Sequence, residues 1–226
     1  MLFQQETARV FRTENKWDAA AMIIESIEAV NTKKKKICLD NGQVFALYNG
    51  EIRHYKLQER AELTEELYEE ILEKILKKRS RERMMYLLKG ADYTEYQIRQ
   101  KLKQSFYPEE AIEEAVCFGR LHHYLDDSRY ARSYTEQKAS RMSRRMLEKK
   151  LKEKGISKEL IEEALTGLET EEEEALDSLI RRKNVDFSRL DWQERQKICA
   201  YFMRKGFAYE NILKKINEIT GNDYLT

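Results

Sequence analysis

The sequence predicts a mainly α-helical protein: three tandem three-helix modules in an elongated array, preceded by a small N-terminal β-hairpin or sheet element. Of its 226 residues, 37% are charged, only eight are Gly and one is Pro. So few turn residues disfavour a β-sandwich, whereas Glu, Lys, Arg and Leu are good helix formers. Two further observations support this prediction: a helical repeat after residue 94, and one stretch with the two-residue period of strands.

The first 60 residues are predicted to hold a disordered leader and the β element. Residues 1–20 show no sustained hydrophobic period and carry mixed charge, as poorly ordered termini do. Between residues 37 and 48, apolar residues alternate on both sides of an Asp-Asn-Gly turn, which predicts a β-hairpin. Residues 22–30 are either a third strand, since a lone ribbon is marginal in water, or a helix. We place the β element within residues 21–60.

From about Glu62 the pattern takes the period of a helix. Glutamates lie near its start and basic residues follow from Lys74 to Arg79, an order that suits the helix dipole and a solvated face. The apolar stripe of this helix consists of Leu63, Leu67, Ile71, Leu72, Ile75 and Leu76.

After Thr94 the chain repeats itself at offsets of 49 and then 51 residues. Each copy is predicted to be an amphipathic helix, a turn and a second amphipathic helix. Gly155 and Gly206 occupy the turn in copies two and three, where a left-handed residue often ends a helix, whereas copy one has Phe106 followed by Pro108. In copy order, the aligned apolar residues are Ile98, Leu147 and Ile198; Leu102, Leu151 and Phe202; Tyr107, Ile156 and Phe207; Ile112, Ile161 and Ile212; and Val116, Leu165 and Ile216.

The repeat places the modules at residues 61–124, 125–169 and 170–226. A further helix precedes each pair, at 80–89, from 127 to about 141, and at 171–183. Helix start signals agree with this division. Thr94 with Gln97 fits a capping box, and Asp127, Ser143 and Ser157 are good N-cap residues.

Nothing in the sequence predicts catalysis, a cofactor or a metal site. The phosphate loop GxxxxGK[ST] is absent, as are GxGxxG, HExxH and GxSxG. The adjacent His122 and His123 cannot share one helical face, and we expect them on the surface near a helix end. Asp126 and Asp127 precede a helical pattern, which favours capping over Mg²⁺ binding. We therefore expect a protein that is not an enzyme.

The overall composition excludes several locations and partners. The longest uninterrupted apolar run has six residues, far short of the roughly 20 that a membrane helix needs, and no secretory signal is evident. A cytoplasmic protein without membrane contact is expected. Cys38, Cys117 and Cys199 form no CxxC pair, and we interpret them as buried thiols. The net charge of +1 provides no global attraction for nucleic acid.

The charge is instead segregated along the chain. Residues 129–154 hold ten basic and three acidic residues, a local net charge of +7, whereas residues 159–177 hold nine acids and no Lys or Arg. Such a pattern suits a charged partner or a protein bound to nucleic acid, although Lys- and Glu-rich amphipathic helices also show it without binding anything. Tyr130 and Tyr134 lie among the arginines, as stacking anchors or as part of the module core.

The second module resembles the RecX family, bacterial modulators of the recombinase RecA. The resemblance rests on Leu125-Asp126-Asp127, Tyr130-Ala131, Arg144-Arg145 and the sequence LKEKGI at 151–156. It extends over about residues 80–219, and the β-hairpin resembles an N-terminal extension of some members. The usual Arg-x-x-Ser-Glu start of the second helix reads Ala-Asp-Tyr-Thr-Glu at 91–95 in this chain.

The resemblance implies a non-enzymatic regulator of homologous recombination, DNA repair and the SOS response. Such a protein, expected as a monomer, binds the RecA filament on DNA and alters its activity, with inhibition the expected direction. Two alternatives stay open: a single-stranded nucleic-acid-binding helical-repeat protein, and a peptide-binding scaffold. The residues expected to contact the partner or DNA are Arg129, Tyr130, Arg132, Tyr134, Lys138, Arg141, Arg144, Arg145, Lys149, Lys150 and Lys152.

Overall fold

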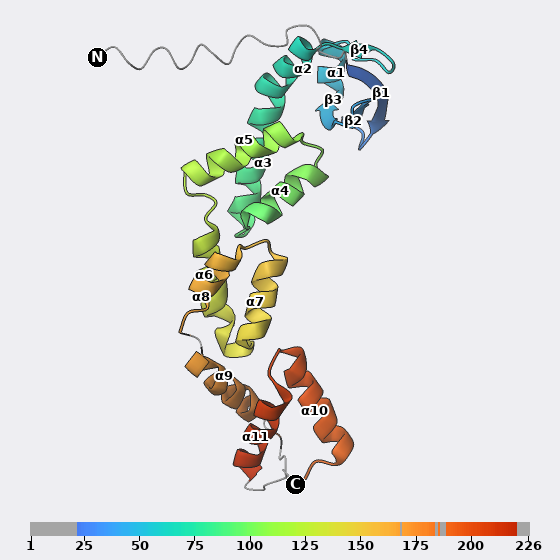
Figure 1. The fold of residues 1–226 in the computed structure, drawn as a ribbon. Coiled ribbons are helices and arrows are strands. Elements are labelled where there is room, and N and C mark those ends of the chain that lie inside the picture. The colour runs from blue at the N-terminus through green and yellow to red at the C-terminus, as the bar shows by residue number, and fades with distance from the viewer. Residues whose placement is uncertain (1–21, 168, 184, 186–188, 221–226) are drawn as a thin grey trace, which may run out of the picture. The chain divides into compact units, whose positions relative to one another are not determined.

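A computed structural model describes residues 22–167, 169–183, 185 and 189–220 (Figure 1). The leader expected at residues 1–20 lies outside this part of the chain. The fold is mainly helical with a small antiparallel sheet, as predicted. It divides into two compact units, described separately: one holds the sheet and the chain up to Met85 together with Lys101–Phe118, and the other holds Tyr86–Gln100 and the chain from Gly119 onward.

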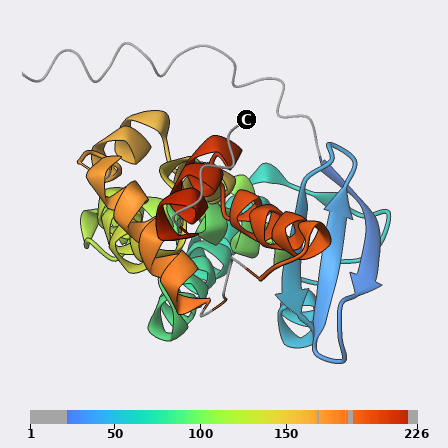
Figure 2. The same cartoon turned by 90° about the horizontal axis from the view of Figure 1, so that it is seen from below.

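Four antiparallel strands form the sheet, in the order β3-β2-β1-β4 (Figure 2). β1 (Met22–Ala29), the segment left open between strand and helix, is a strand. It pairs with β2 (Lys34–Leu39), which forms the predicted hairpin with β3 (Val44–Tyr48). Gly42 lies in the hairpin turn with φ of 83°, a conformation that glycine adopts without a Cβ penalty.

β4 (Glu62–Leu63) corrects the predicted start of the first long helix. Its two residues pair with Ile23 and Met22 of β1, so they belong to the sheet. The helix begins after Thr64, whose hydroxyl accepts a hydrogen bond from the Leu67 N–H at 3.3 Å. The strand is favoured over the helix because it buries the Leu63 side chain fully beside β1. Helical periodicity does not reveal this tertiary contact.

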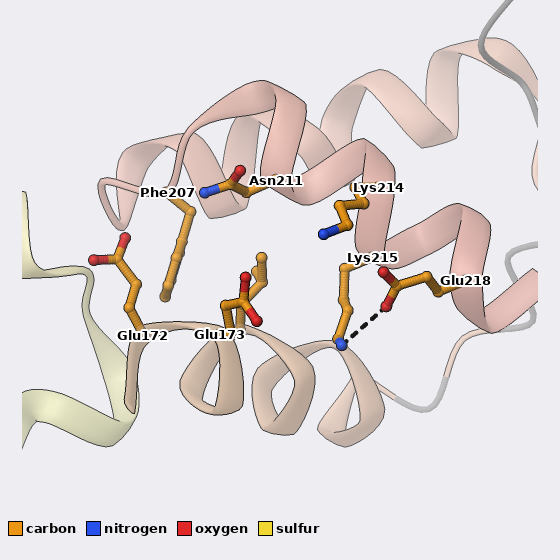
Figure 3. A pocket seen from close by; sticks show the side chains of 8 residues that line it. Glu172, Glu173, Phe207, Asn211, Lys214, Lys215 and Glu218 are labelled. Atoms are coloured by element: carbon orange, nitrogen blue, oxygen red, sulfur yellow. Dashed lines mark hydrogen bonds and ion pairs between the residues drawn. The ribbon is translucent and has the colours of Figure 1, made fainter. Parts of the chain in front are cut away.

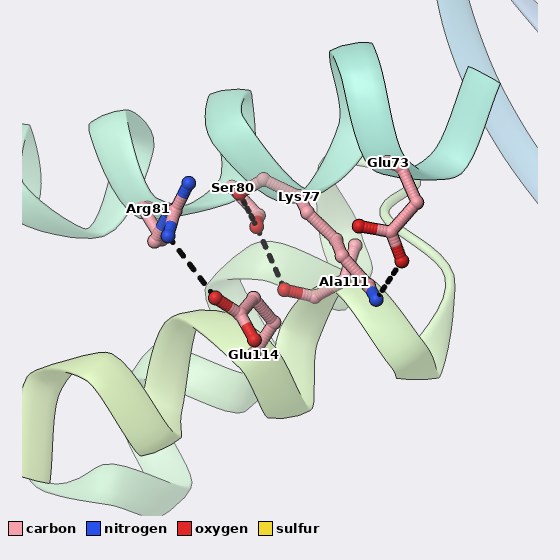
Figure 4. Close-up of polar contacts among 6 residues, drawn as sticks. All are labelled: Glu73, Lys77, Ser80, Arg81, Ala111 and Glu114. Atoms are coloured by element: carbon pink, nitrogen blue, oxygen red, sulfur yellow. Dashed lines mark hydrogen bonds and ion pairs between the residues drawn. The ribbon is translucent and has the colours of Figure 1, made fainter. Parts of the chain in front are cut away.

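The remaining elements are helical. In unit one, Ser80 in the first turn of α3 (Lys77–Gly90) is buried, and its hydroxyl donates to the Ala111 carbonyl of α5 (Glu109–Leu121) at 2.7 Å, beside an ion pair between Arg81 and Glu114 (Figure 4). The helices are α1 (Asn49–His54), α2 (Glu65–Ile71), a π-helical turn (Leu72–Leu76) that continues into α3 (Lys77–Gly90), α4 (Glu95–Gln104), α5 (Glu109–Leu121), α6 (Asp127–Lys138), a 3₁₀ turn (Ala139–Arg141), α7 (Arg144–Glu153), α8 (Lys158–Ala164), α9 (Glu169–Arg182), α10 (Trp192–Arg204) and α11 (Tyr209–Thr220).

The repeat register places equivalent residues in equivalent environments. Of the fifteen aligned apolar residues, all are buried except Ile198, which is partly buried against the core of α9, α10 and α11. The aligned Glu110, Glu159 and Glu210 are all exposed. Each copy therefore directs the same stripe inward and the same position outward, as amphipathic helices with a common register must.

Most helix ends follow local sequence rules. Thr94 and Gln97 form the predicted capping box, and the hydroxyls of Ser143 and Ser157 cap α7 and α8. Gly155 and Gly206 adopt φ of 81° and 93°, as predicted for the turn. Phe106 takes the same left-handed conformation in copy one, with φ of 63°, although a Cβ disfavours it.

Candidate partner-binding surface

The predicted basic segment spans α6, the 3₁₀ turn and α7, and its start differs from the prediction at the cap. Asp126, not Asp127, is the N-cap of α6, and its carboxylate accepts a hydrogen bond from the Arg129 N–H at 2.9 Å. The Asp127 carboxylate reaches across to α4 and accepts from the Glu95 N–H at 2.9 Å. Burial raises the pKa of Asp127, although this hydrogen bond acts in the opposite direction.

One face of α7 carries three exposed members of the basic set. Leu147 and Leu151 are buried in the core of the second module, which fixes how the helix is turned about its axis. Arg145, Lys149 and Lys152 then project into solvent, at intervals of four and three residues that place them on one face. None of these three side chains forms an ion pair within the described residues.

The basic residues of the set on α6 and the 3₁₀ turn differ in how far they are exposed. Arg132 and Arg141 are exposed, whereas Lys138 is half-buried. Arg129 is exposed and its guanidinium lies 3.4 Å from the His123 carbonyl, to which it donates. These cations lie close in sequence to the α7 face and add positive charge to the same module.

Two members of the set are engaged in the fold. Arg144, expected on an exposed face, is half-buried, and its guanidinium donates to the Leu165 carbonyl at 2.5 Å. Its backbone N–H donates to the Glu172 carboxylate at 3.1 Å. Lys150 pairs with Glu153 at 2.8 Å. Arg144 therefore ties α7 to the end of α8 and to α9, so a substitution there would test folding as well as binding.

Tyr130 and Tyr134 belong to the core of the second module, one of the two roles that the sequence left open. Both are partly buried against the core of the second module, and their rings stack with centroids 6.2 Å apart and planes 12° apart. The Lys154 ammonium lies 5.6 Å and 5.3 Å from the two ring centroids, within cation–π range. They also line a cleft whose other residues, from the α3–α4 connection and α6, are Leu88, Asp92, Tyr93, Asp126, Arg129, Ser133 and Gln137.

The cleft includes residues that sequence reasoning missed. Asp92 and Tyr93 come from the connection before α4, where the sequence departs from the family pattern. That departure was the only available signal, because nothing in the linear sequence predicts that this connection lies beside α6.

The acidic strip, residues 159–177, is not a surface that carries negative charge alone. Asp177 of α9 pairs with Arg181 at 2.6 Å and lies 3.9 Å from the Lys215 ammonium of α11. Figure 3 shows Glu172 and Glu173 of α9 facing α11 across a pocket that also contains Phe207. Part of the strip is thus balanced by lysines of the third module, which reduces its value as a separate site for a cationic partner.

Other candidate groups have ordinary structural positions. His122 and His123 are exposed after α5, and His122 stacks on Tyr124 with ring centroids 5.9 Å apart. Cys199 is buried, but Cys38 is half-buried and Cys117 is exposed, so the prediction of three buried thiols is wrong. Cys117 is exposed on α5, next in sequence to the buried core position Val116. Among the described residues, no three His, Cys, Asp or Glu side chains gather to hold a metal ion, and no helix is long and apolar enough to cross a membrane.

Three helix-turn-helix copies, each preceded by a further helix, define a helical-repeat protein, and its second module carries an exposed basic face. Models of the first, second and third three-helix domains of RecX match residues 81–118, 126–165 and 171–216, together more than half of the chain. The chain belongs to the RecX family.

Individual relatives agree with this assignment. The regulatory protein RecX of Caldanaerobacter subterraneus subsp. tengcongensis is 29% identical over 197 residues, which cover 87% of this chain and 98% of the relative. The regulatory protein RecX of Serratia proteamaculans is 31% identical, and the match covers 58% of this chain and 91% of the relative. A crystal structure of a regulatory protein RecX matches with a TM-score of 0.53 and 24% identity, covering 89% of this chain and 100% of that chain. The crystal structure of RecX from Lactobacillus salivarius matches with a TM-score of 0.55 and 20% identity, covering 65% of this chain and 98% of that chain. The two structures support the fold.

Proposed function

We propose that this protein is a non-enzymatic regulator of homologous recombination and DNA repair that binds the RecA filament on DNA and inhibits its activity. It acts as a cytoplasmic monomer and needs no cofactor. The observation that carries the proposal is the exposed face of α7, where Arg145, Lys149 and Lys152 stand in one row without ion-pair partners among the described residues. Membership of the RecX family supports the proposed class of partner.

The electrostatic attraction expected for this protein is confined to one part of its surface. A chain with a net charge of +1 has no general affinity for polyanions, but unpaired cations fixed on a rigid helix attract a surface of opposite sign at short range. Helix α7 is held by the buried Leu147 and Leu151 and capped by Ser143, so the cations keep their spacing. Repeated modules on one chain further allow several modest contacts to add into useful affinity.

Co-sedimentation tests the proposal with RecA filaments on single-stranded DNA, bare single-stranded DNA, and RecA without DNA. We expect binding chiefly to the assembled filament. Replacing Arg145, Lys149 and Lys152 together by Glu should sharply weaken this binding while the helical circular dichroism stays unchanged, because all three side chains are exposed. A matched control replaces Lys78, Lys89 and Lys197, which are also exposed, by Glu. This control should bind as the parent does.

The salt dependence separates contact with DNA from contact with protein. If the three α7 cations touch phosphates, the triple variant should flatten the slope of log affinity against log salt by about two to three, since each phosphate contributes roughly 0.7 to 0.9. A shallower change with weak binding to bare DNA indicates acidic side chains of the recombinase. Strong binding of bare DNA by the parent would favour the single-stranded nucleic-acid binder. Equal binding by the triple variant and the parent would reject the α7 face.

A further inference from the structure

In each helix pair, the residue directly after the first helix has a carbonyl that accepts a hydrogen bond from the preceding part of the chain. In copy two, the Lys154 carbonyl accepts a hydrogen bond from the Thr94 hydroxyl at 2.6 Å. In copy three, the Lys205 carbonyl accepts from the Ser143 N–H at 3.1 Å. Thr94 and Ser143 are the N-caps of α4 and α7, so each junction joins the start of one module's helix to the turn of the next module.

Close approach at these two junctions requires glycine. A Cβ on Gly155 would lie 2.3 Å from the Tyr96 Cβ, and a Cβ on Gly206 would lie 2.3 Å from the Ser143 hydroxyl oxygen. Cβ atoms do not approach other atoms this closely. The start of the helix in the preceding module can therefore pack against the turn only where the turn residue has no side chain.

Copy one has no preceding module, and the same carbonyl has a different partner. The repeat offsets make Ser105 equivalent to Lys154 and Lys205. The Ser105 carbonyl accepts a hydrogen bond at 3.1 Å from the ammonium of Lys34, which belongs to β2. The Lys34 ammonium also lies 5.3 Å from the centre of the Tyr107 ring, and that of Lys36 lies 5.8 Å from the Phe106 ring.

We propose that the N-terminal sheet is the cap of the helical repeat, and that it closes the turn of copy one through Lys34 where a preceding module would otherwise dock. Three physical features support this assignment. Terminal repeats need a cap because one of their faces has no neighbour. A cation at a helix C-terminus complements the dipole and the carbonyls left without intrahelical partners. A long lysine side chain bridges the gap without bringing a backbone close to the turn.

The assignment also explains the exception in the repeat. Because the sheet reaches the turn through lysine side chains, the position equivalent to Gly155 has room for a side chain, and Phe106 occupies it despite its φ of 63°. Its ring then adds a surface on which Lys36 lies. The sheet therefore belongs structurally to the first module, whichever partner the α7 face binds.

Hydrogen exchange in the full chain tests this cap, with Lys34→Met as the perturbation. The change keeps an apolar stem and removes the ammonium. The amides of Phe106 and Tyr107, which donate to Lys103 and Leu102 carbonyls, should exchange about tenfold faster, as expected for losing a hydrogen bond made by a charged group. The equivalent amides of copy three should be unaffected.

Two further variants keep the test decisive. Lys35→Met changes the neighbouring residue, whose side chain points to the other face of the sheet because alternate residues of a strand face opposite sides, and should leave exchange at the turn unchanged. Lys34→Arg retains the charge and should preserve protection. The cap is refuted if Lys34→Met leaves exchange at the turn unchanged, if Lys35→Met has the same effect, or if Lys34→Arg is as damaging as Lys34→Met.

Discussion

Replacing Gly155 by Ala isolates the energetic role of the junction between the first two modules' helices. Gly155 has φ of 81°, and the Cβ of an alanine would meet the Tyr96 side chain at 2.3 Å. Gly167 offers a matched control, because its φ of 85° is nearly the same but nothing lies within 4 Å of its Cβ position. Both substitutions impose the same backbone cost and the same change in the unfolded chain, and only one imposes the clash.

The loss of stability expected for Gly155→Ala has two contributions, the left-handed backbone and the clash with Tyr96. Holding a residue with a Cβ in the left-handed region costs roughly 1 to 2 kcal/mol. Overpacking a well-packed contact costs a further 1 to 3 kcal/mol or so. Gly155→Ala should therefore lower the free energy of unfolding by about 2 to 5 kcal/mol, and Gly167→Ala by only about 1 to 2 kcal/mol. The difference measures how firmly the α4 start is seated on the turn after α7.

Equilibrium urea unfolding followed by helical circular dichroism measures both free energies, and hydrogen exchange locates the change. Gly155→Ala should loosen the amides at the start of α4 and in the turn after α7, whereas Gly167→Ala should not. If the two variants are equally destabilised, the Tyr96 contact yields without cost. The junction would then be a loose contact, and the repeat would lack the fixed docking that we describe.

Three other substitutions test the core, a buried hydroxyl and a half-buried carboxylate. Leu151→Ala should cost about 2 to 5 kcal/mol of stability because the side chain is fully buried, whereas truncating the exposed Lys152 should change the unfolding midpoint little. Ser80→Ala should cost about 0.5 to 1.5 kcal/mol because it removes the buried hydrogen bond between α3 and α5, and Ser80→Thr, which keeps a hydroxyl, serves as its comparison in the same melting assay. The raised pKa of Asp127 means that its contribution to stability is greatest at low pH and is lost as the pH rises through its folded pKa. Asp127→Asn keeps an oxygen for the Glu95 N–H and should flatten the stability curve in this acidic range; an unaltered curve would contradict the assigned shift.

The repeat arithmetic correctly predicted the helix pairs, the turns and the aligned core positions. These features depend on local rules: the 3.6-residue period fixes the buried stripe, a hydroxyl fixes the start of a helix, and glycine permits the left-handed end. Leu102, Leu151 and Phe202 are all fully buried for this reason. The same rules failed at Glu62 and Leu63, where pairing with β1 some forty residues earlier overrides the helical pattern.

The candidate surface was less predictable than the core. The sequence located the basic segment, since charge is read directly from residue type, but it could not separate exposed cations from engaged ones. Arg144 faces the end of α8 and Lys150 pairs within its own helix, while Arg145 and Lys149 face solvent. Burial and pairing depend on how the modules pack, and this information is not contained in the charge pattern.

The sequence by itself determined the family, the helical class and the register of the repeat, because these depend on residue type and spacing along the chain. Only the tertiary structure decided which groups meet across modules. Asp127 reaches Glu95, Thr94 reaches Lys154, and Lys34 reaches Ser105, each at a sequence separation of 32 residues or more. Such contacts depend on how the core of each module orients its helices, so their partners are set by packing in three dimensions and leave no period in the sequence.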